Sequence, residues 1–223
     1  MNKELFKQAM VKFFAGLIIV AILLFLPAWT FRYPQAWLLI CILFVPMFAA
    51  GLIMMKKDPE LLRKRLSAKE KETEQKEVVA LSGVMFLAAF VLAGLSFRFN
   101  WLMLPFPVSI VFAVVFLLAY AMYAEVLREN AYLSRTIEVQ EDQRVVDTGL
   151  YGAVRHPMYS STVVLFLSMP LVLGSVISFI IMLFYIPIIV KRIRNEEQVL
   201  EKDLPGYTEY MKKVKYRLIP FVW

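Results

Sequence analysis

Long uncharged apolar blocks constrain the fold of this 223-residue chain more than any other feature of its sequence. Roughly 20 apolar residues cross the ~30 Å hydrocarbon core of a bilayer as a helix. In lipid every backbone polar group must be satisfied internally, so such blocks fold as helices. We therefore predict an all-α polytopic integral membrane protein. Four blocks of 17 or more residues lie at about 13–30, 36–55, 78–97 and 102–124.

The last apolar block, Tyr159–Val190, has 32 residues and would be about 48 Å long as one straight helix. That is too long for a single crossing, and Pro170 and Gly174 interrupt it near its middle. We predict a helical hairpin with arms at about 158–172 and 175–194. This makes about six transmembrane helices, the last two being the hairpin.

We predict a single domain over residues 1–223. Residues 1–126 hold the four transmembrane helices, and 127–223 form a cytoplasmic, cofactor-binding catalytic region. Within it, 135–146 mixes β-branched and charged residues around a turn-like centre, which indicates a short hairpin or an extended segment. The next residues, Asp147-Thr148-Gly149, are typical of a turn leading into another element.

The basic residues predict the orientation of the helices. Lysine and arginine occur eight times in 56–77 and eight times in Lys191–Arg217, whereas the loops after the first and third spans carry only Arg32 and Arg98. By the positive-inside rule the basic loops and both termini are cytoplasmic. The net charge of +7 therefore reflects membrane topology and not nucleic-acid binding. The segment 58–77 has an amphipathic pattern, which favours a surface helix lying on the bilayer.

Three polar clusters fall on the predicted cytoplasmic side, where polarity beside a membrane indicates function. They are Gln140–Val146, Gly149–Tyr159 and Arg192–Leu200. The hairpin should bring the second and third together, making a pocket with a carboxylate, aromatic rings and guanidinium groups. Such a pocket suits a zwitterionic, adenine-bearing ligand.

Within the third cluster, Arg192 and Glu196 are four residues apart and share one helical face. We expect Arg194 and Glu197 to face elsewhere, towards solvent or lipid headgroups. His156 is the only histidine and Cys41 the only cysteine, which argues against a metal cluster or an internal disulfide. The sequence has no glycine-rich phosphate loop and no serine nucleophile motif.

Residues 128–223 resemble the C-terminal region of the isoprenylcysteine carboxyl methyltransferase family, within a wider group that includes phospholipid methyltransferases. The matching stretches are Arg128-Glu129-Asn130, VQEDQRVVDTGLYGAVRHPMY, RIRNEEQVL and GYTEYMKKVKYRLIPFVW. The combination of RHPxY, RxxxEExxL and GYxxY is more specific than RHPxY alone, which some membrane sterol reductases share. Ser161 stands where the family often has glycine, and we expect this small residue to preserve close packing.

The resemblance implies S-adenosylmethionine as cofactor and a lipidic or prenylated substrate that enters from the bilayer at the cytoplasmic membrane face. The implied reaction is carboxyl O-methylation, with Arg192 facing the substrate carboxylate as a catalytic and substrate-binding residue. The implied cofactor-binding residues are Gln140, Gln143, Arg144, Val145, Val146, Tyr151, His156, Pro157, Met158, Tyr159 and Glu196.

Other functions remain open at this point. A phospholipid amine or a small thiol could accept the methyl group, and an amine would need a base, for which Glu197 is the nearest candidate catalytic residue. A membrane NAD(P)H-dependent reductase is a further alternative, which the Glu196-Glu197 pair disfavours. A non-catalytic scaffold or a transporter is disfavoured because the first four spans carry no ionisable residue near their middle.

Overall fold

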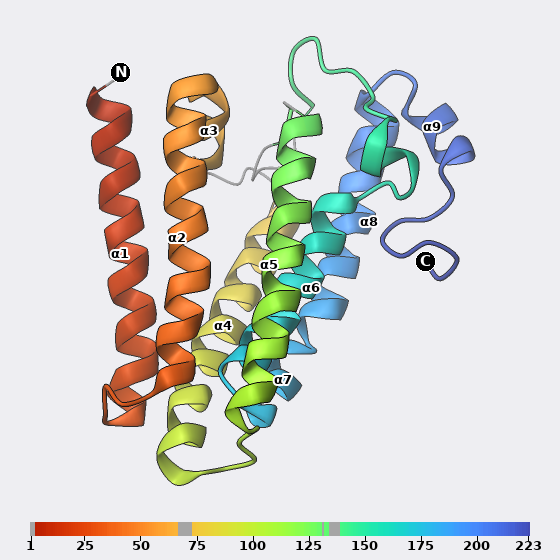
Figure 1. Ribbon diagram of the computed structural model, residues 1–223. Helices are drawn as coiled ribbons and strands as arrows, with labels where there is room; N and C mark the ends of the chain where they lie inside the picture. The colour runs from red at the N-terminus through yellow and green to blue at the C-terminus, as the bar shows by residue number, and fades with distance from the viewer. Residues whose placement is uncertain (1–2, 67–72, 131, 134–138) are drawn as a thin grey trace.

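The fold is all helical over the residues that the computed structural model describes, namely 3–66, 73–130, 132–133 and 139–223. This confirms the predicted fold class. The elements shown in Figure 1 are α1 (Lys3–Ala28), α2 (Pro34–Lys57), α3 (Pro59–Leu66), α4 (Thr73–Phe99), α5 (Phe106–Glu129), η1 (Gly149–Gly152), α6 (Pro157–Val172), α7 (Val176–Met182), α8 (Tyr185–Asp203) and α9 (Tyr207–Lys213).

Five stretches of the described chain are long and apolar enough to cross a membrane, as expected of a multi-pass membrane protein. They are Lys3–Ala28, Pro34–Lys57, Glu77–Phe99, Phe106–Glu129 and Val176–Asp203. The sixth predicted helix is α6, whose 16 residues span about 24 Å, less than the ~30 Å core.

A close contact between α1 and α4 depends on Gly94. A Cβ atom added there would lie 2.5 Å from the carbonyl oxygen of Leu24 and 3.0 Å from Cβ of Pro27. Small residues let transmembrane helices approach in this way, because lipid supplies no hydrophobic drive for helix association. On the other side of the bundle, α5 packs along α6, so the hairpin is held by the preceding helices.

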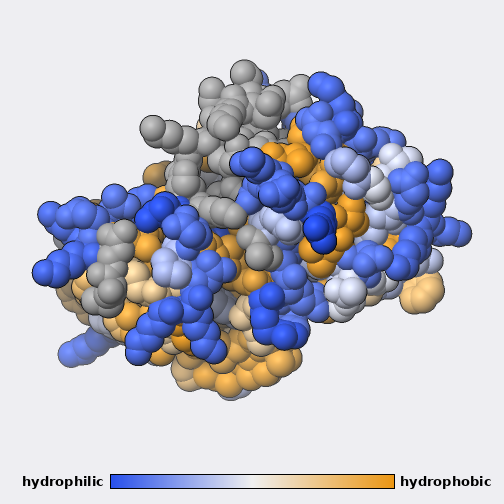
Figure 2. Space-filling view, turned by 90° about the horizontal axis from the view of Figure 1, so that it is seen from above, coloured by the Kyte–Doolittle hydropathy of each residue, from blue (hydrophilic) through white to orange (hydrophobic). Residues whose placement is uncertain are grey.

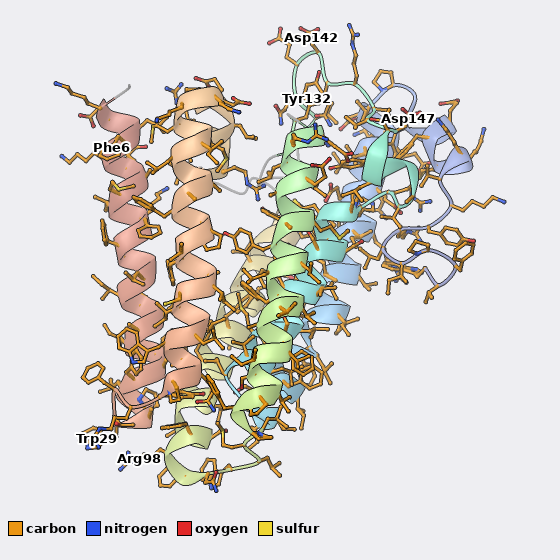
Figure 3. All side chains as sticks on the ribbon, viewed as in Figure 1. Phe6, Trp29, Arg98, Tyr132, Asp142 and Asp147 are labelled. Atoms are coloured by element: carbon orange, nitrogen blue, oxygen red, sulfur yellow. The ribbon has the colours of Figure 1, made fainter. Side chains whose placement is uncertain are left out.

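The predicted hairpin is present, with its turn between α6 and α7 at the end of the bundle opposite the N-terminus (Figure 1). Trp29 and Arg98 mark the same end in Figure 3. There the Tyr33 hydroxyl donates to the carbonyl of Leu173 at 2.6 Å. The backbone N–H of Leu104 donates to the Gly174 carbonyl at 2.7 Å. The returning arm is divided into α7 and α8 and is not one helix over 175–194.

Helix α3 corrects the prediction of an amphipathic helix on the bilayer surface. Leu62 is buried in a cluster with Leu5 of α1 and Met55 of α2. The Lys12 ammonium donates to the Leu66 carbonyl at 2.5 Å, at the C-terminal end of α3. The apolar face of α3 is therefore covered by protein, because α3 folds back over the ends of α1 and α2.

The segment between α5 and α6 carries the predicted turn, which ends at Gly149 and leads into η1. Gly149 has a φ of +52°, and a Cβ atom there would lie 1.6 Å from the Glu129 carboxylate. That carboxylate accepts the backbone N–H of Leu150 at 3.1 Å. The predicted hairpin or extended segment over 135–146 falls partly on 134–138, outside the described residues, and the described part, 139–146, forms no strand.

Candidate active site

The two ends of the hairpin meet at the polar end of the molecule, as the sequence predicted. Arg155, just before α6, donates from Nε to Oε1 of Glu197 on α8 at 2.7 Å. Tyr159 on the first turn of α6 donates its hydroxyl to Glu196. Seen along the helices from above, this end is covered largely by hydrophilic residues (Figure 2).

A cavity that is partly open to solvent lies between the hairpin ends, residues 130, 132–133 and 143–146, and α9. The predicted site residues that line it are Gln143, Arg144, Val145, Val146, Tyr151, His156, Met158, Tyr159, Arg192 and Glu196. Arg155 and Leu200, from the two clusters expected to meet, also line it. Sequence reasoning did not assign the other lining residues to the site: Asn130, Tyr132, Leu133, Leu204, Tyr207 and Tyr210.

Three predicted site residues, Gln140, Pro157 and Glu197, are not among the residues that line this cavity. Gln140 supports the wall from behind: its backbone N–H donates to Oε1 of Gln143 at 2.9 Å, and its Nε2 donates to the Tyr132 carbonyl. Pro157 is the first residue of α6, where proline is favoured because the missing N–H has no helical partner.

Tyr159 links the two charged residues predicted to share a face of α8. Its hydroxyl accepts from Nε of Arg192 at 2.9 Å and donates to Glu196. The side chain is buried against His156, with ring centroids 5.7 Å apart. The guanidinium and the carboxylate are therefore held side by side on the cavity wall.

Glu197 corrects the prediction that it faces solvent or headgroups, because its side chain is only 7% exposed. Its Oε1 accepts from Arg155 at 2.7 Å and lies 3.2 Å from Nε2 of His156. Its Oε2 accepts from Nε of Arg217 at 2.7 Å. Both oxygens are thus engaged by arginines or an imidazole, and the carboxylate itself does not line the cavity.

Glu197 and its partners Arg155, His156 and Arg217, which we call the Glu197 cluster, fix the C-terminal segment against the start of α6. Arg155 donates through a second nitrogen to the carbonyls of Val214 and Lys215. The backbone N–H groups of Arg155 and His156 donate to the carbonyls of Tyr216 and Arg217, each at 2.9 Å. The segment after α9 is therefore attached to the hairpin by both charge and main-chain bonds.

Three more buried tyrosines line the cavity beside Tyr159, namely Tyr151, Tyr207 and Tyr210. The GYxxY spacing was the signal that could have identified the last two. Burial raises the pKa of Tyr151, Tyr207 and Tyr210, so all three phenols are neutral at physiological pH. Asn130 donates to the Tyr151 hydroxyl at 3.0 Å, and the Tyr210 hydroxyl donates to the Tyr151 carbonyl at 2.7 Å. The cavity thus combines neutral rings with one guanidinium–carboxylate pair.

Comparison with known proteins finds two similarities in this part of the chain. Residues 108–202 are similar to the isoprenylcysteine carboxyl methyltransferase (ICMT) family. Over 91 residues the chain is also 33% identical to the mouse Delta(14)-sterol reductase TM7SF2, covering 40% of this chain but only 22% of that protein. The match includes α6 and nearly all of α8, and it confirms the predicted resemblance to the ICMT family over 128–202 of the predicted 128–223. The cavity residues Leu204, Tyr207 and Tyr210 lie beyond the match.

Proposed function

We propose that this protein is an S-adenosylmethionine-dependent methyltransferase that esterifies a carboxylate on a lipidic acceptor, such as an isoprenylcysteine. The observation that carries this proposal is the pairing of Arg192 and Glu196 through Tyr159 on the wall of a cavity built at the end of membrane helices. One cation and one anion, fixed side by side, suit a reaction between an anionic acceptor and a cationic methyl donor.

The residues present fit the proposed methyl donor. The cavity wall offers a carboxylate, neutral aromatic rings and phenol hydroxyls. In this proposal Glu196 accepts hydrogen bonds from the ribose hydroxyls or the ammonium group. Tyr151, Met158 and the main chain of Gln143–Val146 surround the adenosine and methionine parts.

When bound, S-adenosylmethionine supplies a methyl group on a positively charged sulfur. A carboxylate is already ionised at neutral pH, so the chain need not remove a proton. The protein's task is to orient the acceptor and exclude water. Arg192 would bind the acceptor carboxylate and hold one of its oxygens in line with the methyl group of the donor.

Glu197 acts in this proposal as a positioning residue, not as a base. Its carboxylate is held by Arg155 and Arg217, and it does not line the cavity. The lipid part of the acceptor enters sideways from the bilayer, beside the short helix α6. The positive-inside rule supports a cytoplasmic position for this site and for both termini in this proposal, because basic loops lie at the same end.

Two substitutions on α8 test the roles of the charged pair. Arg192→Ala should lower turnover about 100-fold, the effect of one charge-assisted bond of about 3 kcal/mol, while retaining cofactor affinity. Glu196→Ala should instead weaken binding of S-adenosylhomocysteine, measured by titration calorimetry. Arg194→Ala is the matched control, because Arg194 is exposed on the same helix and does not line the cavity. The reverse pattern of losses would refute the assignment.

The acceptor class is tested by the stability of the product. Labelled methyl transferred to a carboxylate is released by base, whereas methyl on an amine or a thiol is retained. Phospholipid amine or thiol methylation would therefore give a base-stable product. An amine acceptor would also need activity that rises through the pKa of a base.

The similarity to a sterol reductase supports a second candidate, a membrane NAD(P)H-dependent reductase. This would use the same cavity for a dinucleotide. Binding of labelled NADPH, with no binding of labelled S-adenosylmethionine, would favour the reductase and reject the methyltransferase.

A further inference from the structure

The hydroxyl of Tyr207 is buried at the cavity with no hydrogen-bond partner among the described residues. The whole residue is only 4% exposed. The neighbouring Tyr210 differs, because its hydroxyl donates to the Tyr151 carbonyl at 2.7 Å. A buried hydroxyl without a partner is costly, so its presence needs an explanation.

Packing alone does not explain the hydroxyl. Tyr207 belongs to an apolar cluster with Leu204, Tyr210 and Val214, in which a phenylalanine ring would fill the same space. The nearby cation does not use it either: Arg155 is engaged by Glu197 and by two carbonyl groups. Tyr207 lines the cavity, so a ligand bound there would lie beside this residue.

The charges around Tyr207 restrict what the hydroxyl can bind. Burial raises its pKa, and the nearby carboxylates of Glu197 and Glu196 raise it further, so the phenol keeps its proton and is available as a donor. A ligand carboxylate at this place would be repelled by the two glutamates. A neutral acceptor, such as a sugar oxygen or a ring nitrogen, would not be.

We propose that the Tyr207 hydroxyl is a binding group for the nucleoside part of the ligand, donating a hydrogen bond to a neutral oxygen or nitrogen of adenosine. This inference rests on the proposed function, since it takes the ligand to be adenosine-bearing. It adds a recognition residue on α9, outside the hairpin and the RHPxY and RxxxEExxL motifs.

The test compares Tyr207→Phe with Tyr210→Phe in the full-length protein in detergent. Without ligand, Tyr207→Phe should leave the melting temperature unchanged or raise it, because it removes an unpaired polar group. Tyr210→Phe should lower it, because it removes a formed hydrogen bond. Tyr207→Phe should also weaken the binding of S-adenosylhomocysteine about five- to tenfold. It should weaken the binding of adenosine, measured by competition, by the same factor.

Three results would overturn the inference. Unchanged affinity for S-adenosylhomocysteine in Tyr207→Phe would show that the hydroxyl does not contact the ligand. A lowered melting temperature without ligand would show a structural hydroxyl. A loss of affinity for S-adenosylhomocysteine without a loss of affinity for adenosine would show that the hydroxyl contacts the ligand outside the nucleoside. Wild-type protein that binds neither compound would refute the proposed function itself, so the two failures are distinguishable.

Discussion

Replacing Glu197 by glutamine tests whether this carboxylate holds the C-terminal segment or acts on the acceptor. Glutamine keeps the size of the side chain but removes its charge. Arg155, whose side chain is 6% exposed, would then keep a buried positive charge without its anionic partner. The second pair, with Arg217, matters less because the Arg217 side chain is 34% exposed and screened by solvent.

Breaking one partner of a buried ion pair costs about 3–5 kcal/mol. We take the lower value, because the amide oxygen of glutamine can still accept one hydrogen bond. About 3 kcal/mol corresponds to a roughly 150-fold increase in the opening equilibrium of the segment that the pair holds. The segment that opens is 214–219, and its opening also breaks the two main-chain hydrogen bonds donated by Arg155 and His156.

Hydrogen exchange measured by mass spectrometry reports this opening directly. Peptides covering 154–157 and 214–219 should exchange roughly 150-fold faster in Glu197→Gln. Glu196→Gln is the matched control, because the adjacent carboxylate contacts Tyr159 on the cavity wall and not the C-terminal segment. In that variant both peptides should exchange at the wild-type rate.

The reasoning would be refuted by one combination of results. If Glu197→Gln leaves both peptides as protected as in the wild type, yet abolishes methyl transfer, Glu197 acts chemically and not by position. A pH profile that loses its rising limb in the same variant would then identify it as the base required by an amine acceptor.

Two further substitutions test the segment before α6. Gly149→Ala should destabilise the protein by about 2–3 kcal/mol, measured by melting in detergent. An alanine in the left-handed conformation is strained, and its Cβ would displace the Glu129 carboxylate from the backbone N–H of Leu150. Gly51→Ala is the control and should show no such loss, because a Cβ atom there meets nothing within 4 Å. Lys213 donates to Asp147 at 2.6 Å and lowers its pKa in the folded chain. The pair therefore stabilises above the unfolded pKa of ~3.9 and is lost as pH falls through the folded value. The difference in melting temperature between wild type and Asp147→Asn should be constant from pH 5 to 8 and should begin to shrink only as the pH falls below about 4. A difference that changes near pH 6–7 would contradict this.

The membrane helices and the hairpin could be predicted because they depend on local properties of the sequence. The length of an apolar block fixes whether it can cross the bilayer, and Pro170 with Gly174 marks where the last block turns. The return of the chain then brings Arg155 close to Glu197, whatever the detailed packing. The coarse position of the site therefore followed from helix length alone.

The directions in which side chains point could not be predicted in the same way. Successive residues on a helix are about 100° apart, so Glu196 and Glu197 face different neighbours, and the sequence does not say which face the C-terminal segment covers. For the same reason the apolar face of α3 could be assigned to lipid or to protein. Leu62 contacts protein because α3 folds back onto α1, a tertiary contact without a local signal.

The two adjacent glutamates show how one turn of α8 can separate binding from support. Glu197 and its cations fix the C-terminal segment, and α9, which supplies Tyr207, begins shortly after α8. Glu196 is left on the cavity wall, joined to Arg192 through Tyr159. A methyl transfer to a carboxylate gains little from a proton donor or acceptor and much from fixed alignment. If the proposed function holds, loosening the Glu197 cluster should therefore lower turnover by letting the cavity wall move, although the Glu197 carboxylate does not line the cavity.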